Sequence, residues 1–232
     1  MGKKTLINTN VKVAIFEDHL SIVDGYLYRF SMEPKIQVVA TIFFGEELEP
    51  TLAQHQVDVL LLAIQVPVSK FNPNPYPVLH SVSSIIQNHP NINILAISMY
   101  TEAVLIRALV DAGISGYIYK NDYASIKQLS RIIFRIANGE TYFSAAAYQH
   151  IHPKESGKTH PILSHRQIEV MSLCASYPDE STVELAARLG VAGSTVRNLL
   201  SNAYVRLGIH TRAAAIAKVI KMGLLSDSSK FK

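Results

Sequence analysis

The sequence predicts an α/β fold, a five-unit (βα)5 doubly wound parallel sheet, followed by a separate all-α domain of four helices. Three observations support this prediction. Strand-like and helix-like segments alternate through the first 138 residues, residues 139–162 are rich in Gly, Pro and His without periodicity, and everything from residue 163 onward has helical periodicity. We therefore expect a first domain at 1–138, a linker at 139–162 and a second domain at 163–232.

The strands of the first domain are short apolar runs rich in branched and aromatic residues. They lie at residues 11–16, 37–42, 57–64, 92–98 and 116–119. Continuous apolarity, as in VDVLLLAI, is typical of strands that are buried on both faces of a parallel sheet. In such a sheet the functional site lies at the carboxyl ends of the strands.

Helix-like segments separate these strands. They lie at residues 19–32, 48–55, 78–88, 101–112 and 123–138. Gly113 follows the fourth helix where a left-handed cap is favoured, and Asp122 can cap the start of the fifth. The fourth helix is apolar nearly all round from Val104 to Val110, interrupted by Arg107. A surface helix normally keeps one polar face, so this helix is either more buried than usual or forms a protein contact.

The second domain begins with two capping boxes. Ser164 pairs with Gln167 and Ser181 pairs with Glu184, each at the start of an apolar helical stripe. A glycine-containing turn at 190–193 leads into a third helix at 194–207, and a fourth helix covers about 212–222. Two short helices joined by a tight turn are the helix-turn-helix arrangement.

Composition limits the class of protein. Hydrophobic residues make up 48% of the chain, there is a single cysteine, and no apolar run is long enough to span a membrane. The start of the chain lacks the apolar run of a signal peptide, so we expect a cytoplasmic protein. The last 70 residues carry nine basic and five acidic side chains, which accounts for the whole net charge of +4. This excess indicates either contact with an acidic polymer or a mildly basic solvated face.

The motifs resemble those of the LuxR/NarL (FixJ) family of two-component response regulators. The second domain carries LSHRQIEVMSLCA and VELAARLGVAGSTVRNLLSNAYVRLGIHTRAAAIA, and the first carries FEDH, DVLLLAIQVP, ISMY and GYIYK after successive strands. The resemblance covers nearly the whole chain except the linker. It implies a receiver domain joined to a DNA-binding domain, and dimerisation through the last helix.

The third helix of the second domain is the candidate DNA reader. With Val196 and Leu200 facing the core, the opposite face presents Arg197, Asn198 and Ser201. These side chains can hydrogen-bond to base edges, and Thr195 at the helix start is placed for a phosphate oxygen. The resemblance also shows three departures: Leu199 stands where many relatives have a polar residue, the segment 177–182 is about two residues longer than usual, and Ala192 replaces a frequent capping serine.

The receiver motifs lack their central group. By the resemblance, Glu17 and Asp18 match the acidic pair, Ser98 the hydroxyl residue, Tyr117 the switch aromatic and Lys120 the lysine, but Ala63 occupies the phosphoacceptor position. A methyl group has no nucleophilic oxygen, so we expect a vestigial phosphorylation site with no bound metal. The next loop, VSKFNPNPYP, also departs from the family pattern. An engineered Asp-to-Ala change would leave that loop intact, which favours a natural alanine.

The sequence therefore predicts a phosphorylation-independent, sequence-specific transcription regulator that binds double-stranded DNA as a homodimer. The alternative is a protein-interaction module that regulates another regulator or a sensor without reading DNA. We expect no enzymatic activity, no cofactor and no membrane contact, and a protein partner could bind through the receiver-like domain.

Overall fold

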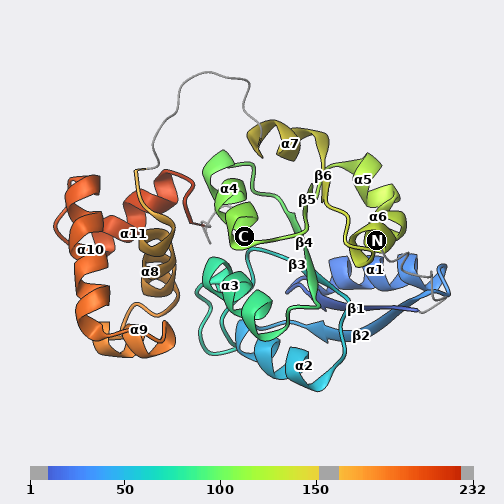
Figure 1. Ribbon diagram of the computed structural model, residues 1–232, viewed down its shortest axis with the longest axis horizontal. Coiled ribbons are helices and arrows are strands. Elements are labelled where there is room, and N and C mark those ends of the chain that lie inside the picture. The colour runs from blue at the N-terminus through green and yellow to red at the C-terminus, as the bar shows by residue number, and fades with distance from the viewer. Residues whose placement is uncertain (1–9, 152–161, 226–232) are drawn as a thin grey trace, which may run out of the picture.

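The computed structural model describes residues 10–151 and 162–225. The first domain is built on one sheet of six parallel strands in the order β2-β1-β3-β4-β5-β6 (Figure 1). The strands are β1 (Val11–Phe16), β2 (Ile36–Ile42), β3 (Val59–Leu62), β4 (Asn93–Ser98), β5 (Gly116–Tyr119) and β6 (Tyr142–Phe143). The predicted doubly wound α/β fold is confirmed, with one strand more than the sequence predicted.

Helices cover both faces of this sheet. They are α1 (Leu20–Ser31), α2 (Leu48–Gln54), α3 (Val78–Asn88), α4 (Ala103–Ala112), α5 (Tyr123–Lys127), α6 (Leu129–Ala137) and α7 (Ala145–Ile151), with a 3-10 turn η1 at Gly45–Glu47. Buried residues of α1 and α6 form one apolar cluster against the sheet, and those of α2, α3 and α4 form another on the opposite face. The fifth predicted helix is divided into α5 and α6 at Gln128.

The segment after residue 138 differs from the predicted linker. Strand β6 pairs with β5, and α7 packs against both β5 and α4. The sequence hid this because two residues of strand and seven of helix are too short for a periodic pattern. Residues 152–161 of the predicted linker lie outside the described residues.

Helix α7 explains the apolarity of α4. Leu105, Ile106, Ala108 and Leu109 are all buried, and α4 packs against α3 on one side and α7 on the other. Of the two interpretations of the segment Val104–Val110, the structure supports the more deeply buried helix. Val104 is the one large apolar side chain of this segment that stays exposed, at 40%, so the buried neighbours leave a single valine and no continuous apolar surface for dimerisation on this helix.

The second domain contains α8 (His165–Ser176), α9 (Thr182–Arg188), α10 (Gly193–Leu207) and α11 (Arg212–Lys221). Both predicted capping boxes form, and Gly190, with φ of +63°, makes the turn between α9 and α10. Helix α8 faces the receiver domain, and α10 lies at the far end of the molecule (Figure 1). Within the described part of the chain, none of the helices is both long and apolar enough to cross a membrane.

Candidate functional site

Helix α10 separates a buried face from a polar face. Its core contacts come from Val196, Leu200, Ala203 and Leu207, all of which are buried. The predicted reader residues point the other way, and each is exposed: Thr195, Arg197, Asn198 and Ser201. Because the receiver domain packs on the α8 side, this polar face is open in the docked two-domain arrangement (Figure 1).

The exposed face is larger than the sequence predicted. Asn202 and Val205 are exposed one turn after Asn198 and Ser201, and Val205 is 78% exposed. Their i+4 spacing from the predicted reader residues was sufficient to identify them. A valine this exposed on a polar helix face is suited to contact the methyl group of thymine.

The start of α10 is suited to a phosphate. Ala192 occupies the N-cap position and its side chain makes no capping hydrogen bond. The amides of Gly193 and Ser194 have no partner one turn back within the helix, whereas the Thr195 amide donates to the Ala192 carbonyl oxygen at 2.9 Å. A helix end of this kind attracts anions through its free N–H groups and its dipole.

The turn at residues 177–182, before α9, is held in place by contacts with the last residue of α9. The Arg188 guanidinium lies over the Tyr177 ring, 3.6 Å from its centroid, and Arg188 Nη2 lies 2.6 Å from Glu180 Oε1. The hydrogen bonds from Arg188 to Glu180 raise the pKa of Arg188. The two extra residues that the sequence indicated in this segment are therefore held in a defined geometry by the last turn of α9.

The residues that the sequence predicted to form a vestigial phosphorylation site converge at the carboxyl ends of the strands. Lys120 Nζ lies 2.5 Å from Glu17 Oε2, and Glu17 is 2% exposed. His19 Nδ1 lies 2.9 Å from Asp18 Oδ1 and 3.1 Å from Glu17 Oε1. Ala63 is buried beside them. The lysine ammonium therefore pairs with Glu17, and the Ala63 methyl group beside it offers no oxygen to bond.

Of the two carboxylates, Asp18 has fewer hydrogen-bond and charge partners than Glu17. Burial raises its pKa, the neighbouring Glu17 raises it further, and His19 acts in the opposite direction. Since Lys120 bonds to Glu17, Asp18 carries the negative charge that this group of side chains leaves unbalanced. His19 balances it only when the imidazole is protonated.

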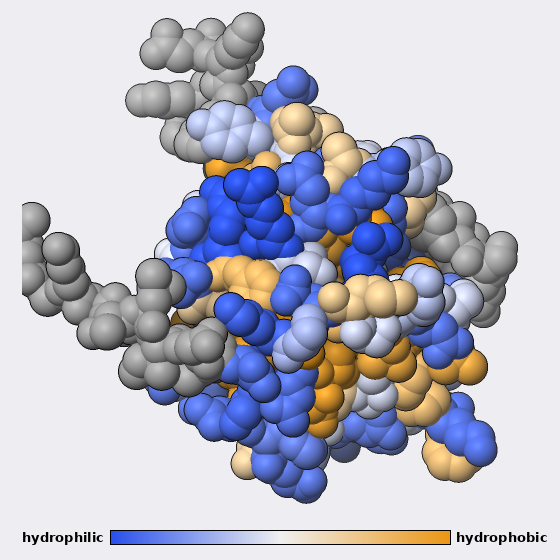
Figure 2. Space-filling view, turned by 90° about the vertical axis from the view of Figure 1, so that its right-hand side faces the viewer, coloured by the Kyte–Doolittle hydropathy of each residue, from blue (hydrophilic) through white to orange (hydrophobic). Residues whose placement is uncertain are grey.

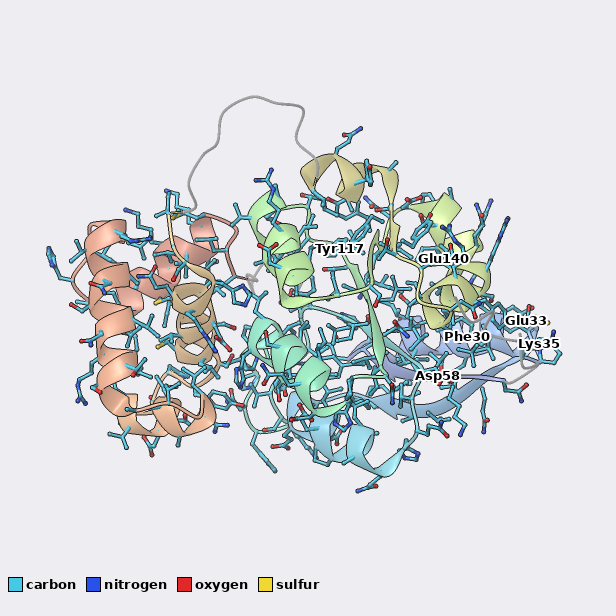
Figure 3. The ribbon with its side chains drawn as sticks, in the orientation of Figure 1. Phe30, Glu33, Lys35, Asp58, Tyr117 and Glu140 are labelled. Atoms are coloured by element: carbon cyan, nitrogen blue, oxygen red, sulfur yellow. The ribbon has the colours of Figure 1, made fainter. Side chains whose placement is uncertain are left out.

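Tyr117 is held inside the domain. Its side chain is fully buried, and its hydroxyl donates to the Tyr100 carbonyl oxygen at 2.7 Å. Figure 3 shows it deep in the receiver domain, beside the sheet. The Tyr100 amide in turn donates to Ser98 Oγ at 3.2 Å. Ser98 and Tyr117 are therefore linked by hydrogen bonds to the backbone of Tyr100, and the Tyr117 ring points inward, into the interior of the domain.

The loop after β3 forms a hairpin over residues 66–76. Its two arms are joined by the Tyr76 amide donating to the Val66 carbonyl at 2.8 Å and the Val68 amide donating to the Asn74 carbonyl at 2.9 Å. Tyr76 packs over Gly45, where any side chain would overlap its ring. The proline- and asparagine-rich sequence thus specifies a fixed structure, which we call the 66–76 hairpin.

The hairpin contacts the second domain at the end of α8. Asn72 Nδ2 donates to the Ser176 carbonyl oxygen at 3.0 Å, and Ser176 Oγ donates to the Pro75 carbonyl oxygen at 2.6 Å. The last carbonyls of a helix lack partners within it, so the receiver domain supplies a cap for α8. Tyr76 lies close enough to Tyr177 and Arg188 for their charges to act on its pKa, although burial is the main cause of its rise. The two segments that depart from the family pattern therefore meet in space.

A hydrogen bond to a buried carboxylate joins the domains beside this cap. His80 Nδ1 of α3 lies 2.8 Å from Glu169 Oε1 of α8, and Arg166 Nη1 lies 2.8 Å from Glu169 Oε2. Glu169 is 3% exposed. Burial raises its pKa, but the hydrogen bonds from His80 and Arg166 outweigh this, and the net pKa is below the ordinary value of 4.5. Sequence reasoning missed the pair because its members are 89 residues apart.

Apolar side chains are also exposed at the opposite end of the molecule. On α1 and just after it, Leu20, Leu27 and Met32 are 62%, 38% and 67% exposed. Figure 2 shows the receiver end, where apolar and polar groups share the surface.

Comparisons with known proteins agree with this architecture. Residues 161–219 match the family model described as bacterial regulatory proteins, luxR family. The chain is 25% identical to the oxygen regulatory protein NreC of Staphylococcus haemolyticus and 24% identical to that of Staphylococcus carnosus, each over 225 residues, or 93% of this chain and 99% of the relative.

Solved structures show the same fold. RcsB of Salmonella enterica serovar Typhimurium, bound to the promoter rprA with a phosphomimetic, has a TM-score of 0.58 at 18% identity, covering 92% of this chain and 99% of that one. A structure of two RcsB dimers on two parallel DNAs has a TM-score of 0.56 at 18% identity, with coverage of 91% and 98%. The chain therefore shares the two-domain fold of these structures, a parallel α/β sheet followed by a helical domain, and the match to the luxR family model lies in that helical domain.

Proposed function

We propose that this chain, whose C-terminal domain is of the LuxR family, is a transcription regulator that reads double-stranded DNA with α10. Arg197, Asn198 and Ser201 would contact base edges in the major groove, with Thr195 on a phosphate. The observation that carries the proposal is the open polar face of α10, which faces away from the docked receiver domain. The protein needs no separation of its domains to present this face.

The regulator would act without phosphorylation of its receiver. Ala63 offers no oxygen for an acyl phosphate, and Lys120 is engaged with Glu17. The inward Tyr117 is held by a hydrogen bond within the protein itself. The arrangement that a phosphoryl group stabilises in phosphorylated family members is supported here by the chain's own contacts.

A homodimer on an inverted repeat is the proposed DNA-bound form. RcsB, to which the chain is structurally similar, has been solved as dimers on DNA. Helix α11 presents three exposed alanines, Ala213, Ala214 and Ala217, which would allow close approach of a second helix. Two reader helices related by a two-fold axis would bind half-sites whose spacing matches their separation.

The substitution Arg197→Ala tests DNA reading. It should weaken specific binding by about 1–3 kcal/mol and relax one base preference, measured by gel shift at fixed salt on a duplex selected from a random pool. Arg131→Ala is the matched control, because Arg131 is an exposed arginine of the receiver domain. Equal losses from the two variants would show diffuse charge attraction instead of readout.

Lys218, on α11, would be a poor control for this experiment. Its Nζ donates to the Leu207 carbonyl oxygen at the end of α10. Removing it would therefore disturb the end of the reader helix as well as the charge.

A further inference from the structure

A cavity of about 470 Å³ lies at the carboxyl ends of β1, β3 and β4, where the vestigial receiver residues converge. Its volume is within the range of sites that bind small organic molecules. The strand ends form its floor, and the 66–76 hairpin forms one wall. Ala63 is part of this floor, at the position that a phosphoacceptor carboxylate would fill.

The walls of this cavity are mainly apolar. Val66, Pro73 and Pro75 line the hairpin side, and Met99 lines the side of β4. Proline rings and branched side chains offer rigid hydrocarbon surface that loses little entropy on binding. A hydrated phosphate or magnesium ion would gain nothing from such walls, whereas a ring system of carbon atoms would.

The charges at the cavity select among apolar ligands. Asp18, His19 and Lys120 line it, and Lys120 Nζ bonds to the buried Glu17 carboxylate at 2.5 Å. Asp18 lines the cavity, and its side chain is 28% exposed. With a neutral His19 imidazole, which lies 2.9 Å from Asp18 Oδ1, one negative charge is in excess, so a cationic ligand is attracted and an anionic one is repelled.

We propose that this cavity binds a small apolar molecule that carries one positive charge, namely an aromatic or alicyclic amine. The ammonium group pairs with the Asp18 carboxylate, and the hydrocarbon part lies over Ala63 against the Pro73–Pro75 side of the hairpin. The inference is independent of DNA reading, because the residues that line the cavity all belong to the receiver domain.

The 66–76 hairpin connects the cavity to the second domain. Pro75 lines the cavity, and its carbonyl oxygen accepts the Ser176 hydroxyl of α8 at 2.6 Å. A ligand that shifts this wall also alters the environment of Ser176. Binding in the cavity therefore changes the end of α8, which packs directly against α10.

Two indole probes of opposite charge test the proposal. Tryptamine and indole-3-acetate share one ring system, and each is titrated into the full-length protein with EDTA present, so that divalent cations do not contribute. Backbone amide NMR shifts of Ala63, Ser98 and Ser176 are followed. Tryptamine should shift all three and bind at least about fivefold more tightly than indole-3-acetate.

Two variants locate the binding. Asp18→Asn should remove the preference for the amine, and Ala63→Leu should abolish the shifts by filling the floor, with circular dichroism confirming that each variant is folded. The proposal is overturned if tryptamine shifts none of these amides or if indole-3-acetate binds as tightly. Unchanged tryptamine binding in a folded Ala63→Leu protein would also overturn it. Loss of DNA binding in Arg197→Ala leaves this result unaffected, so the two proposals fail separately.

Discussion

The His80–Glu169 pair should hold the two domains together by a measurable amount. In His80→Ala, the carboxylate of Glu169 loses one of its two partners while it stays 3% exposed. An unsatisfied buried group costs about 1–3 kcal/mol, and Arg166 still bonds to the other oxygen, so we expect the lower part of this range, about 1–2 kcal/mol. The docked form should therefore become about 5–30 times less favourable relative to the undocked form.

A double-mutant cycle isolates this contribution. His80→Ala, Glu169→Gln and the double variant are labelled at Lys127→Cys and Asn202→Cys, which are exposed on different domains. Energy transfer between the labels then reports undocking in a urea series. The coupling energy should be about 1–2 kcal/mol, and a value below about 0.3 kcal/mol would refute the assignment of the pair as a domain contact.

A similar pair within the receiver domain provides the control. His89 Nε2 lies 3.4 Å from Glu49 Oε2, and both side chains are more than a fifth exposed. His89→Ala should leave the undocking curve unchanged, because the pair does not cross between domains. An equal shift in both variants would show that the assay reports receiver stability instead of docking.

The pH dependence of the coupling has a definite sign. The pKa of Glu169 in the folded protein is below 4.5, so its ionised form contributes above that value. The coupling should persist between about pH 5 and pH 8 and disappear as the pH falls through the lowered pKa of Glu169. A coupling that grows on acidification would contradict this assignment.

Two further predictions concern the second domain. Ala192→Ser should supply the missing cap of α10, which adds about 1 kcal/mol to the free energy of unfolding and raises the Tm by about 2–4 °C in calorimetry. The control Ala187→Ser, in the middle of α9, should not raise the Tm. A lower Tm for Ala192→Ser would refute the assignment of an uncapped helix end. Burial raises the pKa of the Cys174 thiol to about 11, so a disulfide reagent at about pH 8 should modify the native protein at least about 100-fold more slowly than free cysteine, and rapid labelling would show that α8 is exposed.

Much of the fold could be predicted from local patterns. The capping boxes at Ser164 and Ser181 fix the starts of α8 and α9, because side chain and backbone bond within three residues. The buried face of α10 follows from helical spacing alone, and the exposure of Arg197 and Asn198 follows with it.

What the sequence could not show depends on distant contacts. Helix α7 is too short to be recognised from the sequence. Because α7 packs against α4, it covers a face of α4 that would otherwise be exposed, which explains why α4 is apolar nearly all round. The 66–76 hairpin and the 177–182 turn each departed from the family pattern, but only the folded chain shows that Pro75 bonds to Ser176 between them. No periodic pattern encodes a pairing of residues 101 positions apart.

We propose that this chain reads DNA without a phosphoryl group on its receiver. Selection from a random duplex pool with the untreated protein tests it most directly, followed by repeated binding with and without acetyl phosphate and Mg²⁺. We predict enrichment of an inverted repeat by the untreated protein, with affinities that agree within about twofold in the two conditions. Enrichment that requires acetyl phosphate would contradict the account, because it would show a phosphoacceptor other than position 63 controlling α10.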